Sequence, residues 1–267
     1  MGLDSDSWWC GHLTASHPHP HPRGCSPVHA LLFGLSSGAL GVALLTSQVN
    51  PLTGLLGGIN ILLYTLVYTP MKRWSVANTW AGSVVGAIPP VMGWTACTGD
   101  IHSGALVMAA MLFAWQFPHF NSLSWSVRGD YKRGGYKMMA HTNPDLCKRV
   151  ALRYSVAMIP ICTAAPLCDL TTWWFALDTL PINIYLTYLS WQFYQDANFK
   201  TARKLFRFTL FHLPLIMAFL FIHKKSRVAH SQSQSSHWGD TLRACTALLL
   251  SGTIYKSFPM HVLQAHI

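Results

Sequence analysis

The chain has 267 residues, of which 51% are hydrophobic and only 10% charged, and its formal net charge is +10 at pH 7. A soluble protein of this length would need more charge to keep its surface solvated, so the composition indicates a membrane protein. Bases do not alternate with aromatic residues as they do in nucleic-acid-binding motifs. We therefore expect the positive charge to serve membrane topology and an anionic ligand, with membrane lipid and no nucleic acid among the partners.

The two ends of the chain differ in composition from the middle. Residues 1–22 form an atypical, low-complexity N-terminus in which three histidines alternate with proline. This tract cannot span a membrane and is either a metal-binding segment or filler. Residues 226–267 form a divergent or disordered C-terminal tail, whose short apolar piece we expect not to span. The intervening residues 23–225 make up the membrane domain.

Seven stretches of this domain are long and apolar enough to cross a membrane as helices. The sequence therefore predicts an all-α fold, a polytopic bundle of transmembrane helices. The seven spans lie at Val28–Ser47, Leu52–Thr69, Val76–Ala96, Ser103–Ser124, Val150–Leu167, Trp173–Tyr194 and Leu205–Ile222.

Charge alternates between the loops that connect these spans. Lys and Arg concentrate in the loops at 70–76, 125–149 and 195–206, whereas the loops at 48–51, 97–102 and 168–172 contain neither. Loops rich in Lys and Arg stay on the cytoplasmic side of membranes. We therefore expect the three basic loops to face the cytoplasm or a topological equivalent, such as the mitochondrial matrix or the chloroplast stroma. Only the bases after the last span, at 224–227, depart from this pattern.

One acidic residue stands at the membrane boundary that precedes the longest basic loop. Asp130 lies among Arg128, Lys132 and Arg133, in a chain whose nine acids are all Asp. Ionisable groups at such a boundary are typical of functional sites. The Asp130 carboxylate could be a hard oxygen ligand for Mg²⁺, whose other positions would be filled by substrate phosphates and water. A simple ion pair with a neighbouring Arg is the alternative.

Tyr68 and Lys72 lie four residues apart at the basic end of the second span. If the helix continues past Pro70, both side chains point to one face. A phenol and an ammonium group suit the oxygens of a phosphate or diphosphate. The alternative is that both residues only anchor the helix at the membrane interface.

Three further positions near the same boundary carry polar or small side chains. Asn78 opens the third span, where its carboxamide needs a partner, either another helix or a ligand oxygen. Gly82 and Gly86, four residues apart, are typical of closely packed helices. His119 follows Gln116 near the end of the fourth span and could be a satisfied polar residue, a base, a proton relay or a haem contact.

Four segments together resemble one family. They are Tyr68–Arg73 (YTPMKR), Asn78–Trp94, Trp115–Trp125 (WQFPHFNSLSW) and Asp130–Met139 (DYKRGGYKMM). In combination they closely resemble the protoheme IX farnesyltransferases (haem O synthases), above all those of the mitochondrial animal type, within the UbiA-type intramembrane prenyltransferases. The resemblance implies a bundle of nine helices, seven of them here, around a central cavity that opens to the matrix side of the mitochondrial inner membrane.

The resemblance also implies an activity. Members of the family transfer the farnesyl group of farnesyl diphosphate to haem B and so make haem O, a step in haem A synthesis for cytochrome c oxidase assembly. Mg²⁺ is the implied cofactor, and haem A synthase or oxidase assembly factors are implied partners. Carried over by motif, the expected catalytic residues are Asp130, Lys72 and His119, with Asp130 also the metal ligand. The expected diphosphate-binding residues are Tyr68, Lys72, Arg73, Asn78, Lys132 and Arg133.

The sequence departs from the family pattern in two places. The first acidic motif and the two helices before it, expected ahead of Arg23, are absent, and Gly134 stands where a second Asp would follow Asp130. We therefore expect an N-terminally incomplete chain that makes little haem O by itself. One alternative function is that of an inactive membrane assembly or haem-binding protein. The other is that of a small-molecule transporter, whose ionisable residues usually lie mid-span.

Overall fold

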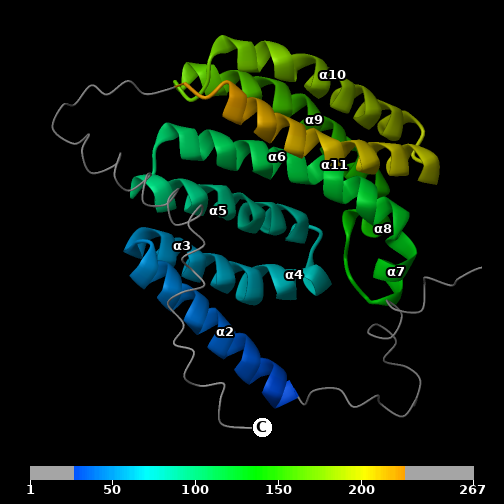
Figure 1. Cartoon of the computed structure of the whole chain (residues 1–267). Coiled ribbons are helices and arrows are strands. Elements are labelled where there is room, and N and C mark those ends of the chain that lie inside the picture. Colours follow the sequence, from blue (N-terminus) through cyan, green and yellow to red (C-terminus); the bar gives the residue numbers. More distant parts are fainter. Residues whose placement is uncertain (1–26, 226–267) are drawn as a thin grey trace, which may run out of the picture. The chain divides into compact units, whose positions relative to one another are not determined.

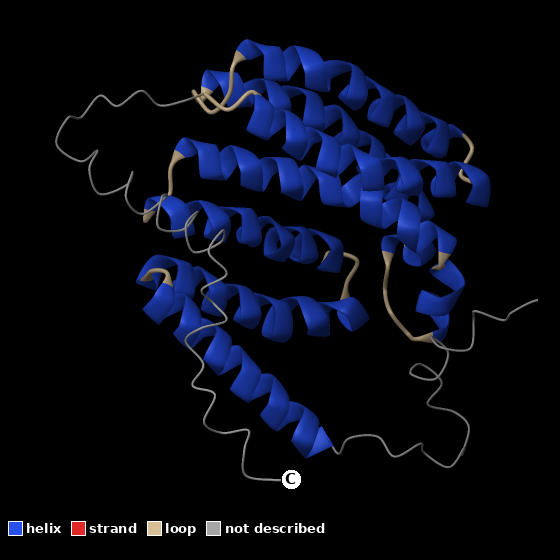
Figure 2. Ribbon diagram, viewed as in Figure 1, coloured by secondary structure: helices blue, strands red, loops and turns tan. Residues whose placement is uncertain are grey.

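The computed structural model describes residues 27–225, and this part of the chain is helical apart from short connections and one isolated bridge between Thr171 and Lys224 (Figure 2). The elements in chain order are α2 (Pro27–Gln48), α3 (Pro51–Leu62), the π-helix η1 (Leu63–Tyr68), α4 (Thr69–Trp74), α5 (Asn78–Thr98), α6 (Ser103–Ser126), α7 (Arg128–Arg133), α8 (Met139–Thr142), α9 (Pro144–Leu167), α10 (Trp173–Gln195) and α11 (Phe199–Ile222).

Seven long helical segments occupy the places of the seven predicted spans, the second of them formed by α3, η1 and α4 in continuous succession. Consecutive segments run in opposite directions (Figure 1). The connections α4–α5, α6–α9 and α10–α11 therefore fall at one end of the bundle, and α2–α3, α5–α6 and α9–α10 fall at the other. The all-α bundle is confirmed. The basic loops, as expected, share one end, which we call the basic end.

Four of the seven segments, rather than all of them, are apolar enough by composition to cross a membrane: Val28–Gln48, Pro51–Trp74, Pro144–Leu167 and Phe199–Ile222. The other three, α5, α6 and α10, each contain Pro and Trp together with buried polar side chains such as Asn121 and Asn183. These groups lower the hydropathy of a helix although other helices, instead of lipid, surround them. The predicted seven long helical segments are present, and composition by itself identifies four of them as candidate spans.

Two helices begin six residues before the predicted spans, because caps rather than hydropathy set their starts. Asn143 accepts a hydrogen bond from the backbone of Leu146 at the start of α9. Asn198 and Thr201 form a capping box at the start of α11. The first turns that these caps add carry several Lys and Arg residues. A hydropathy window excludes such turns, whereas side-chain capping stabilises them.

The core lies among α6, α9, α10 and α11, where aromatic and small side chains interlock. Phe117, Phe175 and Phe193 are fully buried, and the Ser155 and Ser190 hydroxyls hydrogen-bond across α9 and α10 at 2.6 Å. Small polar residues at helix contacts of this kind are typical of membrane bundles. This core holds α6 in place, and α6 carries one wall of the site described below.

The bases that follow the last span are held at the end opposite the basic end. The ammonium group of Lys225 forms an ion pair with Asp169 at 2.6 Å, and Lys224 pairs with Thr171 through the isolated bridge. Asp169 belongs to one of the loops that lack Lys and Arg, so part of this departure from the charge pattern is neutralised locally. The predicted N-terminal tract and C-terminal tail lie outside the described residues.

Candidate active site

Tyr68 and Lys72 share one face of a helix that continues past Pro70. Proline lacks an N–H and its ring collides with the carbonyl one turn earlier in a regular α-helix. Here the preceding turn widens into the π-helix η1, and the Thr69 hydroxyl donates a 2.8 Å hydrogen bond to the carbonyl of Tyr64. The Lys72 ammonium nitrogen lies 4.3 Å from the centre of the Tyr68 ring and 5.6 Å from that of Tyr64. The structure thus brings the predicted pair together.

A cavity of about 340 Å³ lies beside this pair, between η1, α5 and α6. Two of the predicted site residues, Tyr68 and His119, line it. The full lining is Tyr64, Tyr68, Thr79, Gly82, Ser83, Val85, Gly86, Trp115, Gln116, His119 and Phe120. Four of these eleven residues are Tyr, Trp or Phe. The cavity therefore combines a largely aromatic wall with a few polar groups, as ligand sites usually do.

The two glycines of α5 make room for side chains of this cavity. A Cβ atom on Gly82 would lie 2.8 Å from the Tyr68 ring, and one on Gly86 would lie 2.2 Å from the Gln116 side-chain oxygen. The Gln116 amide nitrogen donates to the carbonyls of Ser83 and Leu112, both at 3.1 Å. The Gly82 and Gly86 spacing was interpreted as close helix packing. The structure shows that it admits the side chains of Tyr68 and Gln116.

His119 is fixed by contacts with α11 and with its own helix. Its Nδ1 lies 2.8 Å from the Thr209 hydroxyl oxygen, and its ring stacks on Trp115 with centres 4.5 Å apart. The Phe206 ring lies on a further side, at 5.0 Å. Thr209 lies 90 residues from His119 in the sequence, so this partner could be found only from the tertiary structure.

Asn78 ties the longest basic loop to the start of α5. It is fully buried, and its amide nitrogen donates to the carbonyls of Ser75 at 2.6 Å and Lys137 at 2.9 Å. The Lys137 backbone N–H in turn donates to the carbonyl of Lys72 at 2.8 Å. Since the amide hydrogens of Asn78 point at backbone oxygens, this residue positions the loop, and its expected contact with the diphosphate stays a prediction.

Tyr131 brings the basic loop to the rim of the cavity. Its ring centre lies 6.4 Å from that of Phe120, a residue that lines the cavity. Burial, with a smaller effect of Tyr136, raises the pKa of the Tyr131 phenol. The hydroxyl therefore stays protonated and can donate a hydrogen bond. Tyr131 lies in the motif Asp130–Met139, but its position in the sequence does not indicate a role.

The remaining predicted residues lie on the exposed surface of the basic end. Asp130 forms an ion pair with Arg133 one turn later in α7, with both side chains more than half exposed. Arg73 and Lys132 are also exposed. The ion pair that the sequence left as an alternative for Asp130 is therefore present. An exposed pair of this kind contributes little stability, so Asp130 can exchange Arg133 for another cation at small cost.

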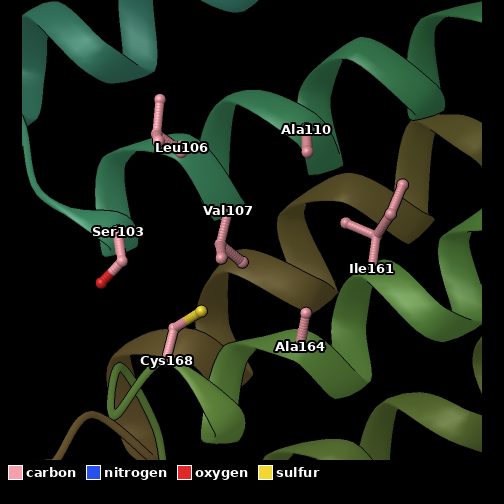
Figure 3. A pocket seen from close by; sticks show the side chains of 7 residues that line it. All are labelled: Ser103, Leu106, Val107, Ala110, Ile161, Ala164 and Cys168. Carbon is pink, nitrogen blue, oxygen red and sulfur yellow. The ribbon is translucent and has the colours of Figure 1, made fainter.

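A second pocket, of about 270 Å³, lies between α6 and α9 toward the opposite end of the bundle (Figure 3). Its walls are the side chains of Leu106, Val107, Ala110, Ile161 and Ala164, with Ser103 and Cys168 at one edge. Because these walls offer no group that could bind a phosphate, the pocket beside Tyr68 is the better candidate for the site.

Residues 13–220 match the model of the UbiA prenyltransferase family. The chain belongs to this family. A solved structure has a similar fold. It is described as digeranylgeranylglyceryl phosphate synthase in membranes, and it superposes on this chain with a TM-score of 0.64 at 13% sequence identity. The superposition covers 73% of this chain and 69% of the other.

Curated relatives are more similar to this chain in sequence than that solved structure is. The mitochondrial protoheme IX farnesyltransferase of Homo sapiens is 54% identical over 77% of this chain, and that of Saccharomyces cerevisiae is 40% identical over 80%. The aligned parts make up 47% and 51% of those two proteins. The chain thus spans about half the length of the curated relatives it matches.

UbiA prenyltransferases typically use a divalent metal ion with a diphosphate substrate. Within residues 27–225, no group of three or more His, Cys, Asp or Glu side chains comes together. Asp130 supplies one accessible carboxylate instead, next to Tyr131 at the cavity rim. A single carboxylate fits an ion of the Mg²⁺ type, which takes most of its ligands from substrate phosphates and water.

Proposed function

We propose that the protein transfers the farnesyl group of farnesyl diphosphate to haem B and so makes haem O, the activity for which its curated relatives are named. The observation that carries this proposal is the aromatic cavity with the Tyr68 and Lys72 pair at its basic end. An apolar chain fits the aromatic part, and a diphosphate fits the cationic end. The 54% identity to the human protoheme IX farnesyltransferase supports the choice of substrates.

The diphosphate would bind where Lys72, Arg73 and the basic loop meet. The Tyr68 hydroxyl and the Lys72 ammonium group donate to its oxygens from one helix face, and the exposed Arg73, Lys132 and Arg133 add positive charge. Charge-assisted hydrogen bonds of this kind are about twice as strong as neutral ones. In this arrangement Asp130 would hold Mg²⁺, which would help to neutralise the leaving diphosphate.

The chain's own residues would stabilise both charges that develop in the reaction, the positive one on carbon and the negative one on the diphosphate. When the bond between the first farnesyl carbon and the diphosphate oxygen breaks, the leaving group takes the electron pair and an allylic cation develops. The faces of the Tyr64, Trp115 and Phe120 rings can stabilise that cation. Lys72, which is only partly exposed, stabilises the negative charge that develops on the diphosphate. The electrons of a haem vinyl group then form the new carbon–carbon bond.

The same reasoning extends to the location of the protein. We propose that it lies in the mitochondrial inner membrane with the basic end toward the matrix, since the curated relatives are named as mitochondrial and loops rich in Lys and Arg stay on the inner side. Haem A synthase and oxidase assembly factors, which would receive haem O, are the proposed partners.

A transfer assay in liposomes tests this function. We would reconstitute the 267-residue chain, and the same chain extended by the N-terminal segment of the human relative, with farnesyl diphosphate, haem B and Mg²⁺. Haem O formation by at least one form is the expected result, and Tyr68→Phe with Lys72→Met should abolish it. If neither form makes haem O while both bind haem, the protein is a haem-binding assembly protein and the proposed activity is wrong.

A further inference from the structure

We infer that Thr209 holds His119 in the tautomer whose proton is on Nδ1, so that Nε2 acts as the proton acceptor of the cavity. This inference rests on the proposed function for the identity of the reaction, but its structural part is independent of it. Thr209 lies on α11 and is fully buried. Thr209 is a positioning residue, because its hydroxyl contacts the His119 imidazole and does not line the cavity.

Hydrogen-bond bookkeeping fixes the tautomer. A threonine hydroxyl has one proton to donate. Thr209 lies 2.6 Å from the carbonyl oxygen of Phe206, which can only accept, so the hydroxyl proton goes there. The same hydroxyl oxygen lies 2.8 Å from Nδ1 of His119. With its proton already used, the oxygen must accept, and Nδ1 must carry the hydrogen. A neutral imidazole protonated at Nδ1 has its lone pair on Nε2.

The packing around His119 holds the ring in this orientation. Trp115 stacks on one side with an interplanar angle of 19°, and both residues line the cavity. Phe206 contacts the ring from α11. Within residues 27–225, no hydrogen-bond partner of Nε2 is seen. The lone pair of Nε2 is therefore left for a group that enters the cavity.

The reaction needs such a group. After the vinyl carbon has bonded to the farnesyl carbon, a positive charge remains on the vinyl carbon next to the haem ring. It is quenched when a proton is lost, either from the carbon skeleton or from a water molecule that adds to the cation through its oxygen. Nε2 would take that proton and become N–H, and its ring would carry one positive charge. Atoms and charges balance with water as the one co-reactant when its oxygen adds to the cation, and with no co-reactant when the carbon skeleton loses the proton.

Nitrogen NMR tests the tautomer directly. Full-length chain with ¹⁵N-labelled histidine in nanodiscs would be compared with His119→Gln, which identifies the signals of this ring. We expect a protonated Nδ1 and an unprotonated Nε2. Thr209→Ser, which keeps the hydroxyl, should preserve this pattern. Thr209→Val should give a mixture of both tautomers. A proton on Nε2 in the unsubstituted chain would overturn the inference.

Turnover in the active form tests the role of the lone pair. Thr209→Val should lower kcat about ten-fold or more with little change in the KM for farnesyl diphosphate, and Thr209→Ser should restore it. Thr163→Val is the matched control, because within the described part of the chain the Thr163 hydroxyl bonds only to carbonyls of its own helix, those of Ile159 and Pro160. It should leave kcat unchanged.

Three outcomes would contradict the role of Nε2. Equal kcat in the Thr209→Val and Thr163→Val variants would assign Thr209 to packing alone. A haem absorption spectrum that changes on His119→Gln as expected for loss of an iron ligand would assign Nε2 to iron. Inactivity of the unsubstituted chain in every form would remove the proposed function and with it the role as a base. In that case the NMR result would still decide the tautomer.

Discussion

The backbone N–H of Lys137 donates a 2.8 Å hydrogen bond to the carbonyl oxygen of Lys72. Lys72 lies in α4 and Lys137 lies in the loop between α7 and α8, 65 positions apart by number. This bond holds the longest basic loop against the end of α4. The loop carries Asp130 and Tyr131, whereas α4 carries Lys72. The bond therefore fixes the distance between the residues proposed to hold the metal ion and those proposed to hold the diphosphate.

Asn78 should stabilise this junction. Asn78→Leu removes the two bonds to the carbonyls of Ser75 and Lys137 and leaves both oxygens without that donor. We expect the free energy of unfolding to fall by about 2 kcal/mol or more, measured by thermal unfolding in detergent. Asn60→Leu is the control, since the buried Asn60 side-chain oxygen has no partner within the described residues. An equal loss of unfolding free energy in the two variants would contradict the stabilising role of Asn78.

Gly86 should be required for the shape of the cavity. Gly86→Ala places a methyl group 2.2 Å from the Gln116 side-chain oxygen and must displace that amide from the cavity wall. Small displacements in a reactive site lower rates strongly, so we expect haem O formation to fall about ten-fold or more. Gly93→Ala, on the same helix, meets nothing within 4 Å and should leave the rate unchanged. Similar rates in the two variants would show that the Gln116 position is unimportant.

Lys72 should bind the diphosphate. Lys72→Met keeps the length of the side chain but removes its charge, and one lost charge-assisted bond weakens binding roughly 10- to 100-fold. Calorimetric titration with farnesyl diphosphate measures this change in Kd. Lys200→Met controls for the general field of the basic end, because Lys200 is exposed at the start of α11. An equal change in Kd in the Lys72→Met and Lys200→Met variants would mean that Lys72 acts only through the net charge of the basic end.

Asp130 should set the metal requirement. Removing divalent metal with EDTA should stop haem O formation, and added Mg²⁺ should restore it. In Asp130→Asn the Mg²⁺ concentration for half-maximal activity should rise about ten-fold or more, since the one charged oxygen ligand is lost. Asp145→Asn is a matched control, because Asp145 is also exposed and also pairs with a base three residues later, Lys148. A rise in both variants would exclude a specific role for Asp130.

Opposite ends of the bundle should label from opposite sides of the membrane. Cys97 is exposed at the end that lacks basic loops, and a cysteine in place of Lys200 marks the basic end. With the other cysteines replaced, a membrane-impermeant maleimide should label one of these positions in sealed mitochondria and the other only after the inner membrane is opened. Labelling of both from one side would contradict the alternating topology.

The sequence by itself determined the features that depend on neighbouring residues. Hydropathy located the seven long helices, because the length and apolar character of a stretch that can cross a membrane are properties of that stretch alone. The alternation of Lys and Arg between loops grouped the basic loops at one end. The spacing of Tyr68 and Lys72 placed them on one face, since residues four apart face the same way on a helix.

Only the tertiary structure decided which residues from distant helices meet. Three contacts join segments from separate helices or loops. They are the contact of His119 with Thr209, the room that Gly86 leaves for Gln116, and the bond from Asn78 to Lys137. The sequence showed a polar or small residue at several of these places without its partner. Packing settles such pairings, because a buried polar group must find whichever donor or acceptor the folded bundle brings beside it.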